Sequence, residues 1–294
     1  MVSQRAAEAV DLSRRFLPEH LTPLFYTPIY EELSETQKLR YNQLHASYIL
    51  EQTIFFESSM ARHILTQLAR TSLPEGWSNG LRTFVEEENR HSQMFRELNR
   101  RCLPGHYGES DFYFIRIGSA TASLLAFWVK HPTRFPLFLW LLLLEEERSL
   151  HYSRQFVKAA PQLEPSFVLV QRAHMADEVG HIGWDEKLLD WIWPRTPLWQ
   201  RKLNARLFVW LVGEYFNTPR RGGLRVIRKF ITEFPALRPR LEEMEQQILS
   251  LAQDVEYHRS LYSREITPKA FARFDDWEEF RGIEEVLLAY EPAR

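Results

Sequence analysis

The sequence has one cysteine, Cys102, among its 294 residues. A single thiol cannot form an internal disulfide, and it cannot provide the several thiolates that a four-cysteine zinc site or an iron–sulfur cluster requires. These absences fit a reducing environment, so we expect a cytoplasmic protein.

The sequence also has little excess of either charge, because it contains 37 basic and 39 acidic residues and its formal net charge is −2. This balance gives no electrostatic reason to expect a nucleic-acid partner. Residues 1–8 are polar and contain no apolar stretch of the signal-peptide kind.

Long apolar runs are few. The longest covers residues 135–144 and stops at three consecutive glutamates. It reaches only about half of the roughly 20 residues that a membrane-spanning helix needs. We therefore expect a helix buried on all sides in a large core, and no membrane span.

Glycine is scarce, with 11 residues, and alternating strand-like runs are hard to find. Prolines fall between segments with helical periodicity, which predicts an all-α protein. With no linker rich in glycine or serine, we expect a single domain over 1–294, with its metal-binding core at about 35–193. The pattern predicts helices over 35–70, 77–101, 136–160, 166–193, 197–216, 222–233 and 238–262, and a partly helical connection over 108–131.

Two matching Glu-x-x-His motifs lie in the second and fourth long helices: Glu88 with His91, and Glu178 with His181. Side chains three residues apart leave a helix on the same face, so each pair can bind one metal ion. One such pair arises easily by chance in a long helix. Two of them, each preceded by an acid, indicate a metal centre.

The preceding acids are Glu87 and Asp177. They point to another part of each helix, where they could accept the outer N–H of a ligand histidine on the facing helix. A solvated surface role is the alternative for both.

Each motif has a glutamate opposite it if the helices form hairpins. Glu57 precedes Glu88 by 31 residues and Glu147 precedes Glu178 by 31 residues, and both midpoints fall in predicted helix breaks. One Glu from each of two helices plus Glu-x-x-His from the other two is the pattern of ferritin-like di-iron proteins. The symmetry favours Glu147 among three adjacent glutamates as the ligand from the third helix. For the ligand from the first helix, Glu51 is the nearby alternative to Glu57. We expect a ferritin-like four-helix bundle core with additional C-terminal helices.

His174 lies on the same helical stripe as Glu178 and His181. As a ligand it would make the two metal positions unequal; the alternative is a histidine satisfied in the core. His151 shares a helix face with Glu147, where it could support a ligand or simply pack. Carboxylates and imidazoles suit iron or manganese better than structural zinc.

The stretch 172–181 (Arg-Ala-His-Met-Ala-Asp-Glu-Val-Gly-His), together with 88–91 (Glu-Asn-Arg-His), resembles the arylamine N-oxygenases of the p-aminobenzoate N-oxygenase type. The resemblance covers about 57 to 185. It implies a ferritin-like fold, two iron ions and an O2-dependent oxidation of an amine nitrogen to the hydroxylamine, nitroso or nitro level. By it, the ligands would be Glu57, Glu88, His91, Glu147, His174, Glu178 and His181.

Other functions share these ligands. A di-iron hydroxylase or desaturase acting on carbon and a ferritin-type ferroxidase both remain alternatives. A radical-generating ribonucleotide reductase subunit fits less well, because Phe95 stands where such subunits place a tyrosine. No flavin or nicotinamide fingerprint is evident, so we expect an external electron donor beside the small-molecule amine and O2. A monomer and a homodimer are both compatible with the sequence.

Overall fold

The computed structural model describes residues 9–292. The N-terminal octapeptide, where the sequence predicts no export signal, lies outside the described residues. Within 9–292 the ordered elements are helices, and one isolated bridge between Arg15 and Leu163 is the extent of β pairing. The prediction of an all-α fold is confirmed.

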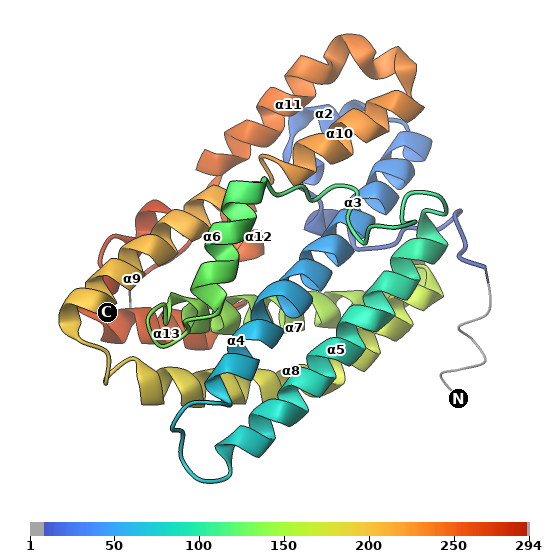
Figure 1. The fold of residues 1–294 in the computed structure, drawn as a ribbon. Coiled ribbons are helices and arrows are strands. Elements are labelled where there is room, and N and C mark those ends of the chain that lie inside the picture. The colour runs from blue at the N-terminus through green and yellow to red at the C-terminus, as the bar shows by residue number, and fades with distance from the viewer. Residues whose placement is uncertain (1–8, 293–294) are drawn as a thin grey trace.

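Two helical hairpins form the centre of the molecule (Figure 1). The first helix of the first hairpin is interrupted by one π-helical segment and is followed by α5, and the second hairpin pairs α7 with α8. Contacts between α5 and α8 join the two hairpins. The ferritin-like arrangement expected from the sequence is therefore present. The core elements are α3 (Glu35–Phe56), η3 (Glu57–Ala61), α4 (Arg62–Leu68), α5 (Trp77–Cys102), α7 (Leu137–Lys158) and α8 (Pro165–Ile192).

Local sequence sets the ends of these helices. Ser34 and Gln37 form a capping box that starts α3. Gly76, with φ of 81°, lies immediately before α5, and this left-handed conformation favours glycine. Glu164 accepts hydrogen bonds from the first backbone amides of α8, whose first residue is proline.

The apolar run in α7 is a core helix. All side chains from Leu137 to Leu144 are at most 1% exposed. Between residues 9 and 292 we find no helix with enough length and apolar character to cross a bilayer. The hydrophobic effect therefore places this run at the centre of the protein fold.

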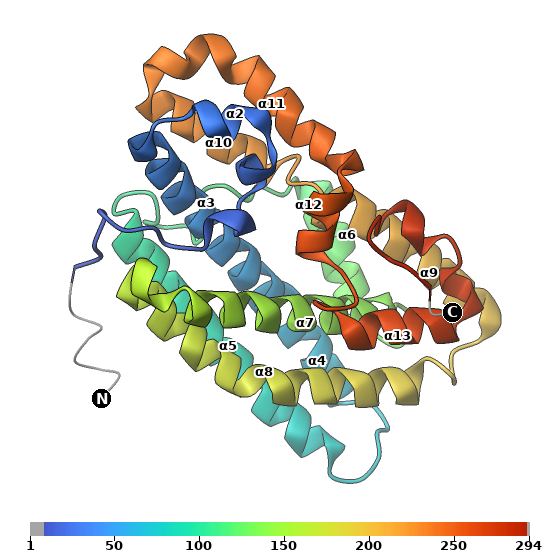
Figure 2. The same cartoon turned by 180° about the vertical axis from the view of Figure 1, so that it is seen from behind.

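Further helices surround this core (Figure 2). α10 packs on α3, whereas α9 and α13 pack on α7. The sequence-based helix over 238–262 is divided into α11, a 3₁₀ turn and α12, and α13 and the short N-terminal helices were not predicted. These outer elements are α2 (Pro28–Glu32), α6 (Ser119–Val129), α9 (Leu198–Leu211), η5 (Val212–Phe216), α10 (Gly222–Glu233), α11 (Leu241–Ser250), α12 (Val255–Leu261) and α13 (Pro268–Asp276).

Candidate metal centre

Glu57 enters the bundle from a π-helical turn. It is the first residue of η3, where the chain departs from α-helical hydrogen bonding for five residues. Such turns insert an extra residue into a helix and occur frequently at functional sites. The Glu57 side chain is 3% exposed, and its Oε2 accepts a hydrogen bond from Ser92 Oγ at 3.1 Å. The turn thus directs a buried carboxylate toward α5 and α8.

The two Glu-x-x-His motifs face each other across the α5–α8 interface. Glu88, His91, Glu178 and His181 are each at most 1% exposed. His181 Nδ1 lies 3.1 Å from Glu88 Oε1 on the other helix and 3.4 Å from Glu178 Oε1 on its own. The prediction that both motifs converge is confirmed.

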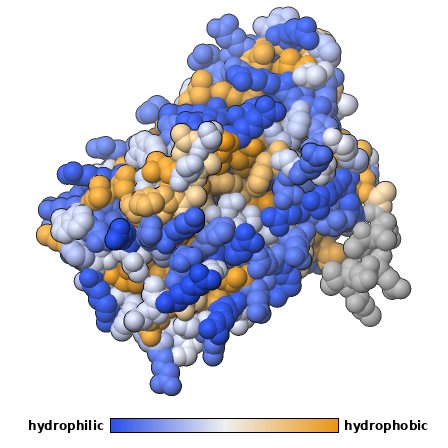
Figure 3. Space-filling model, in the orientation of Figure 1, coloured by the Kyte–Doolittle hydropathy of each residue, from blue (hydrophilic) through white to orange (hydrophobic). Residues whose placement is uncertain are grey.

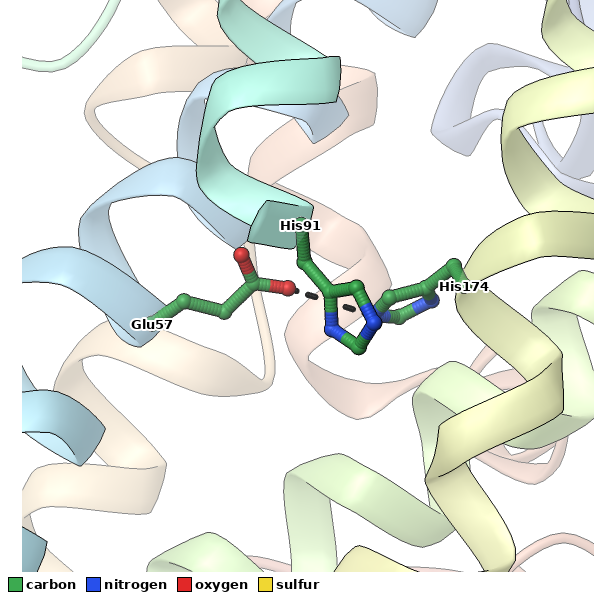
Figure 4. A group of neighbouring side chains, drawn as sticks. All are labelled: Glu57, His91 and His174. Atoms are coloured by element: carbon green, nitrogen blue, oxygen red, sulfur yellow. Dashed lines mark hydrogen bonds and ion pairs between the residues drawn. The ribbon is translucent and has the colours of Figure 1, made fainter. Parts of the chain in front are cut away.

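His174 completes the stripe on α8. Its Nε2 lies 3.1 Å from Glu57 Oε1 and 3.0 Å from Glu178 Oε1, and its ring lies edge-on to the ring of His91 (Figure 4). It therefore belongs to the cluster and is not an isolated core histidine. Three groups of potential ligand atoms each lie within 4.8 Å of one another: Glu57, His91 and His174; Glu88, His91 and His181; and Glu146, Glu178 and His181.

Glu178 occupies the middle of the cluster. Its Oε1 lies 3.0 Å from His174 Nε2, 3.4 Å from His181 Nδ1 and 3.8 Å from His91 Nδ1. A single carboxylate close to three imidazoles is suited to bridge two cations.

The acid that precedes each motif contacts the histidine of the other motif, on the facing helix. Asp177 on α8 lies 3.0 Å from Nε2 of His91 on α5, and Glu87 on α5 lies 3.1 Å from Nε2 of His181 on α8. Arg90 also pairs with Asp177 at 2.8 Å. Each acid can therefore fix the ring orientation that turns the opposite nitrogen, Nδ1, into the cluster.

The three adjacent glutamates of α7 point in three directions. Glu145 pairs with Arg148 and accepts a hydrogen bond from Tyr262 Oη at 2.6 Å. Glu146 reaches the cluster, beside Glu178. Glu147 is buried but accepts hydrogen bonds from the backbone amides of Lys269 and Ala270, at 2.9 Å each.

The choice of Glu147 from hairpin symmetry is therefore corrected to Glu146. The amides that bind Glu147 belong to the first turn of α13, where backbone N–H groups have no partner within the helix. The helical pattern of the sequence does not predict α13, so it does not indicate these competing donors to Glu147. His151, on the Glu147 face, lies 3.3 Å from Gln155 Nε2 and is absent from the three ligand groups.

Glu51, the alternative to Glu57, has a separate structural role. Its carboxylate accepts hydrogen bonds from Tyr107 Oη and from the backbone amides of Tyr113, Phe114 and Ile115, at 2.7–3.0 Å. It therefore holds the segment between α5 and α6 in place.

Burial and mutual charge shift the proton affinities of the cluster. Burial raises the pKa of Glu57 to about 8, and neighbouring Glu88 adds to this rise. Burial alone would lower the pKa of His174, but Glu178 and Glu57 raise it to about 10. Burial lowers the pKa of His91 to about 4, with the charge of His174 adding to the effect. Cations bound here would displace protons, so metal affinity depends on pH.

The donor set fits two divalent cations. Both oxygens of Glu88 and of Glu178, and Nδ1 of His91 and of His181, are buried and form no well-aligned hydrogen bond among the described residues, although Glu88 Oε1 and Glu178 Oε1 lie 3.1 Å and 3.0 Å from His181 and His174. Unpaired buried polar atoms are costly, whereas coordination of a cation satisfies them. Four carboxylates and neutral imidazoles around two divalent ions sum to zero charge. Carboxylate and imidazole ligands suit iron and manganese.

Two polar residues beside the cluster escaped the sequence analysis. Asp185 is fully buried, and neither of its oxygens has a hydrogen-bond partner within residues 9–292. Extending the α8 stripe by four residues from His181 would have found it. Ser92, which contacts Glu57, follows His91 directly and carried no signal of its own.

A cavity leads to one side of the cluster. It has a volume of about 110 Å³, and Glu57, Glu146 and His174 form part of its wall. Aromatic rings from four elements, α3, α7, η5 and α12, make up much of the remainder, which is suited to a flat or apolar molecule. The aromatic side chains are Tyr48, Phe56, Tyr152, Tyr215, Phe216 and Tyr257.

A family model described as "P-aminobenzoate N-oxygenase AurF" matches residues 4–255. The match therefore includes both hairpins and every residue of the cluster. No curated protein matches the chain.

Proposed function

Because the chain belongs to the family of p-aminobenzoate N-oxygenases, a family of ferritin-like di-iron enzymes, we propose that it oxidises the nitrogen of a small-molecule amine with dioxygen. The observation that carries this proposal is the cavity whose wall includes Glu57, Glu146 and His174. An iron-storage protein has no need of such an aromatic chamber beside its metal centre. An oxygenase needs one to position its substrate.

We propose that seven residues hold two iron ions. Glu57, Glu88, His91, Glu146, His174, Glu178 and His181 would hold the pair. The three atom groups, the orphaned oxygens and the zero net charge support this assignment. Manganese has the same ligand preferences, so metal analysis of the purified protein must decide between the two.

Two iron ions bound here would supply the electrons that activate O2, a step for which amino-acid side chains alone are unsuited. The protein orients the ligand rings through Glu87 and Asp177, excludes bulk water by burial, and places the amine beside Glu57 and Glu146. In the first oxidation, one amine, one O2, two electrons and two protons give one hydroxylamine and one water. We propose that a separate reductase supplies the two electrons.

The test is incubation of the iron-loaded, reduced enzyme with 4-aminobenzoate and ¹⁸O2. We expect a hydroxylamine, nitroso or nitro product that carries ¹⁸O on nitrogen, detected by mass spectrometry. The variant Glu57→Gln should form little of it, whereas Glu265→Gln, a change outside the cluster and its cavity, should match the wild type. Label on carbon instead would favour hydroxylase chemistry, and oxidation of iron without an organic product would favour a ferroxidase. Native mass adds a second criterion, because a monomer or homodimer excludes a ferritin-type cage.

A further inference from the structure

Helix α6 is apolar although it lies on the surface. Its eleven residues include no charged side chain, and Val129 is the one residue of the helix that is buried. Leu124 and Phe127 remain 44% and 48% exposed. A helix without a charged face is normally buried in a protein core or placed against lipid. The exposed side of α6 is therefore suited to contact another molecule.

Helix α9 extends this apolar surface. Trp199, Leu203 and Trp210 are 69%, 45% and 48% exposed. Spacings of four and seven residues place these three side chains on one side of α9. The buried Ala205 and Phe208 lie on the opposite side, which packs against the core.

The two helices lie beside each other (Figure 1). Gln200, in the first turn of α9, donates hydrogen bonds to the backbone carbonyls of Thr133 and Arg134, just after α6, at 2.9 Å and 3.1 Å. Further along, Leu124 of α6 and Trp210 of α9 line one cavity of about 170 Å³. Figure 3 shows hydrophobic side chains gathered over both helices. We call this surface the apolar face, and it consists of Ile117, Leu124, Phe127, Trp199, Leu203 and Trp210.

The segments that form the apolar face contain basic residues and no acids. Residues 112–134 include Arg116, Lys130 and Arg134 but no aspartate or glutamate, and residues 191–213 include four basic residues and likewise no acid. The net charge of the whole chain is −2, so positive charge is concentrated in these segments. Such a concentration attracts an anionic partner.

Much of this positive charge is uncompensated. Lys130, Lys202 and Arg206 are exposed, and none of them forms an ion pair within residues 9–292. Glu214, the next acid after α9, pairs with Arg221 at 2.8 Å. The acidic turns of residues 278–285 contact α9 from the other side of the molecule, which Figure 2 shows in front.

Basic residues around exposed tryptophan, phenylalanine and leucine suit one kind of partner particularly well. An anionic bilayer attracts lysine and arginine, and its headgroup zone accommodates the rings of tryptophan and phenylalanine. A second copy of the chain fits less well, because a twofold contact would bring the same basic residues of both copies together. α6 has about half of the roughly 20 residues that a spanning helix needs, so it would lie along the bilayer surface.

We propose that the apolar face binds the surface of an anionic phospholipid bilayer. Phe127, Trp199 and Trp210 lie among the lipid headgroups, and Lys202 and Arg206 contact lipid phosphates. The binding is peripheral and reversible, since no part of the described chain crosses the bilayer. This inference goes beyond the proposed function and depends on no particular reaction.

Membrane binding would also orient the route to the metal cluster. The cavity between α6 and α9 is lined by exposed residues of the apolar face, and it shares Tyr48 and Phe56 with the cavity beside the cluster. A molecule dissolved in the bilayer could therefore enter this route without passing through bulk water.

The test is co-sedimentation of the iron-loaded protein with vesicles. One set consists of phosphatidylcholine alone, and in the other one-third of the lipid is phosphatidylglycerol. We expect at least tenfold tighter binding to the anionic vesicles at about 0.1 M salt, and loss of this preference at about 1 M, because the Debye length falls from about 10 Å to about 3 Å. Equal binding to both sets, or binding to neither, would overturn the proposal.

Charge variants locate the contact on α9. Lys202→Gln combined with Arg206→Gln should weaken binding to the anionic vesicles at least tenfold, because one basic residue near such a surface contributes about fivefold. The matched control is Arg154→Gln combined with Arg172→Gln, which removes the same charge from exposed positions on α7 and α8. Equal losses in the two double variants would show a nonspecific effect of net charge and would refute the assignment to the apolar face.

An apolar variant tests insertion and the alternative partner. Leu203→Ser should weaken vesicle binding at least threefold, whereas Leu12→Ser, at a position 54% exposed and outside the apolar face, should match the wild type. Circular dichroism verifies the fold of both. Sedimentation velocity without lipid completes the test: a dimer that Leu203→Ser dissociates would assign the apolar face to a second copy and overturn the proposal, and a monomer supports it.

Discussion

Neutralising Glu146 should abolish one of the two metal positions, whereas neutralising its neighbour Glu147 should not. Glu146 belongs to the group with Glu178 and His181, and it is 3% exposed. With two divalent ions, Glu146→Gln leaves one uncompensated positive charge in the bundle. At an effective dielectric constant of about 20, two unit charges about 4 Å apart contribute about 4 kcal/mol, which is a lower bound for a divalent ion. That loss corresponds to a decrease in affinity of about a thousandfold.

Glu147→Gln is the matched control. It weakens the hydrogen bonds from the amides of Lys269 and Ala270, so we expect a loss of about 1–2 kcal/mol in the free energy of unfolding with metal binding unchanged. The assay is anaerobic titration with Fe²⁺ against a competing chelator, with urea unfolding measured in parallel. Two tight equivalents in Glu146→Gln, or one in Glu147→Gln, would refute the geometric assignment and restore the assignment from hairpin symmetry.

Three further predictions follow from the described contacts. Asp177→Asn should lower iron affinity by about 10–100-fold, because the hydrogen bond that orients His91 is weakened, and an iron titration matching the wild type would contradict this role. Burial lowers the pKa of His45 to about 3, so this histidine stabilises the fold fully only above the unfolded-state pKa of about 6.5, and the stability falls as pH decreases below it. At pH 5 the free energy of unfolding should be about 2 kcal/mol lower than at pH 7 because of this histidine. Urea unfolding of His45→Gln between pH 5 and 7 should lack this part of the pH dependence. Gly180→Ala should stabilise the protein by about 0.5–1 kcal/mol, because the added Cβ meets no atom within 4 Å. Gly80→Ala should destabilise it, because the added Cβ would lie 2.0 Å from the Trp184 ring. Thermal unfolding of the two variants tests both expectations.

Side-chain spacing was sufficient to predict most of the buried cluster of glutamates and histidines. Residues three and four apart on a helix share a face whatever the tertiary structure, so the stripes of α5 and α8 could be identified from the sequence. The helix breaks near 71–76 and 161–165 gave both hairpins, and the acids Glu87 and Asp177 occupy the crosswise positions expected of them.

Hairpin symmetry was less precise than helix spacing. Neighbouring residues on an α-helix point about 100° apart, so an error of one residue in the register selects a different face. The decision between Glu146 and Glu147 depends on α13, which lies far along the chain and offers unsatisfied amides to Glu147. The π-helical turn at Glu57 likewise depends on tertiary packing, for which the local sequence has no distinct pattern.

The two histidine–carboxylate pairs between α5 and α8 make metal binding depend on the correct alignment of these helices. If one helix slid past the other by a single turn, about 5.4 Å, both His91–Asp177 and His181–Glu87 would separate together. A misaligned bundle would then hold its histidines in the wrong orientation and bind a metal ion poorly. Metal ions would consequently bind to correctly aligned molecules and stabilise that alignment against the alternatives by mass action.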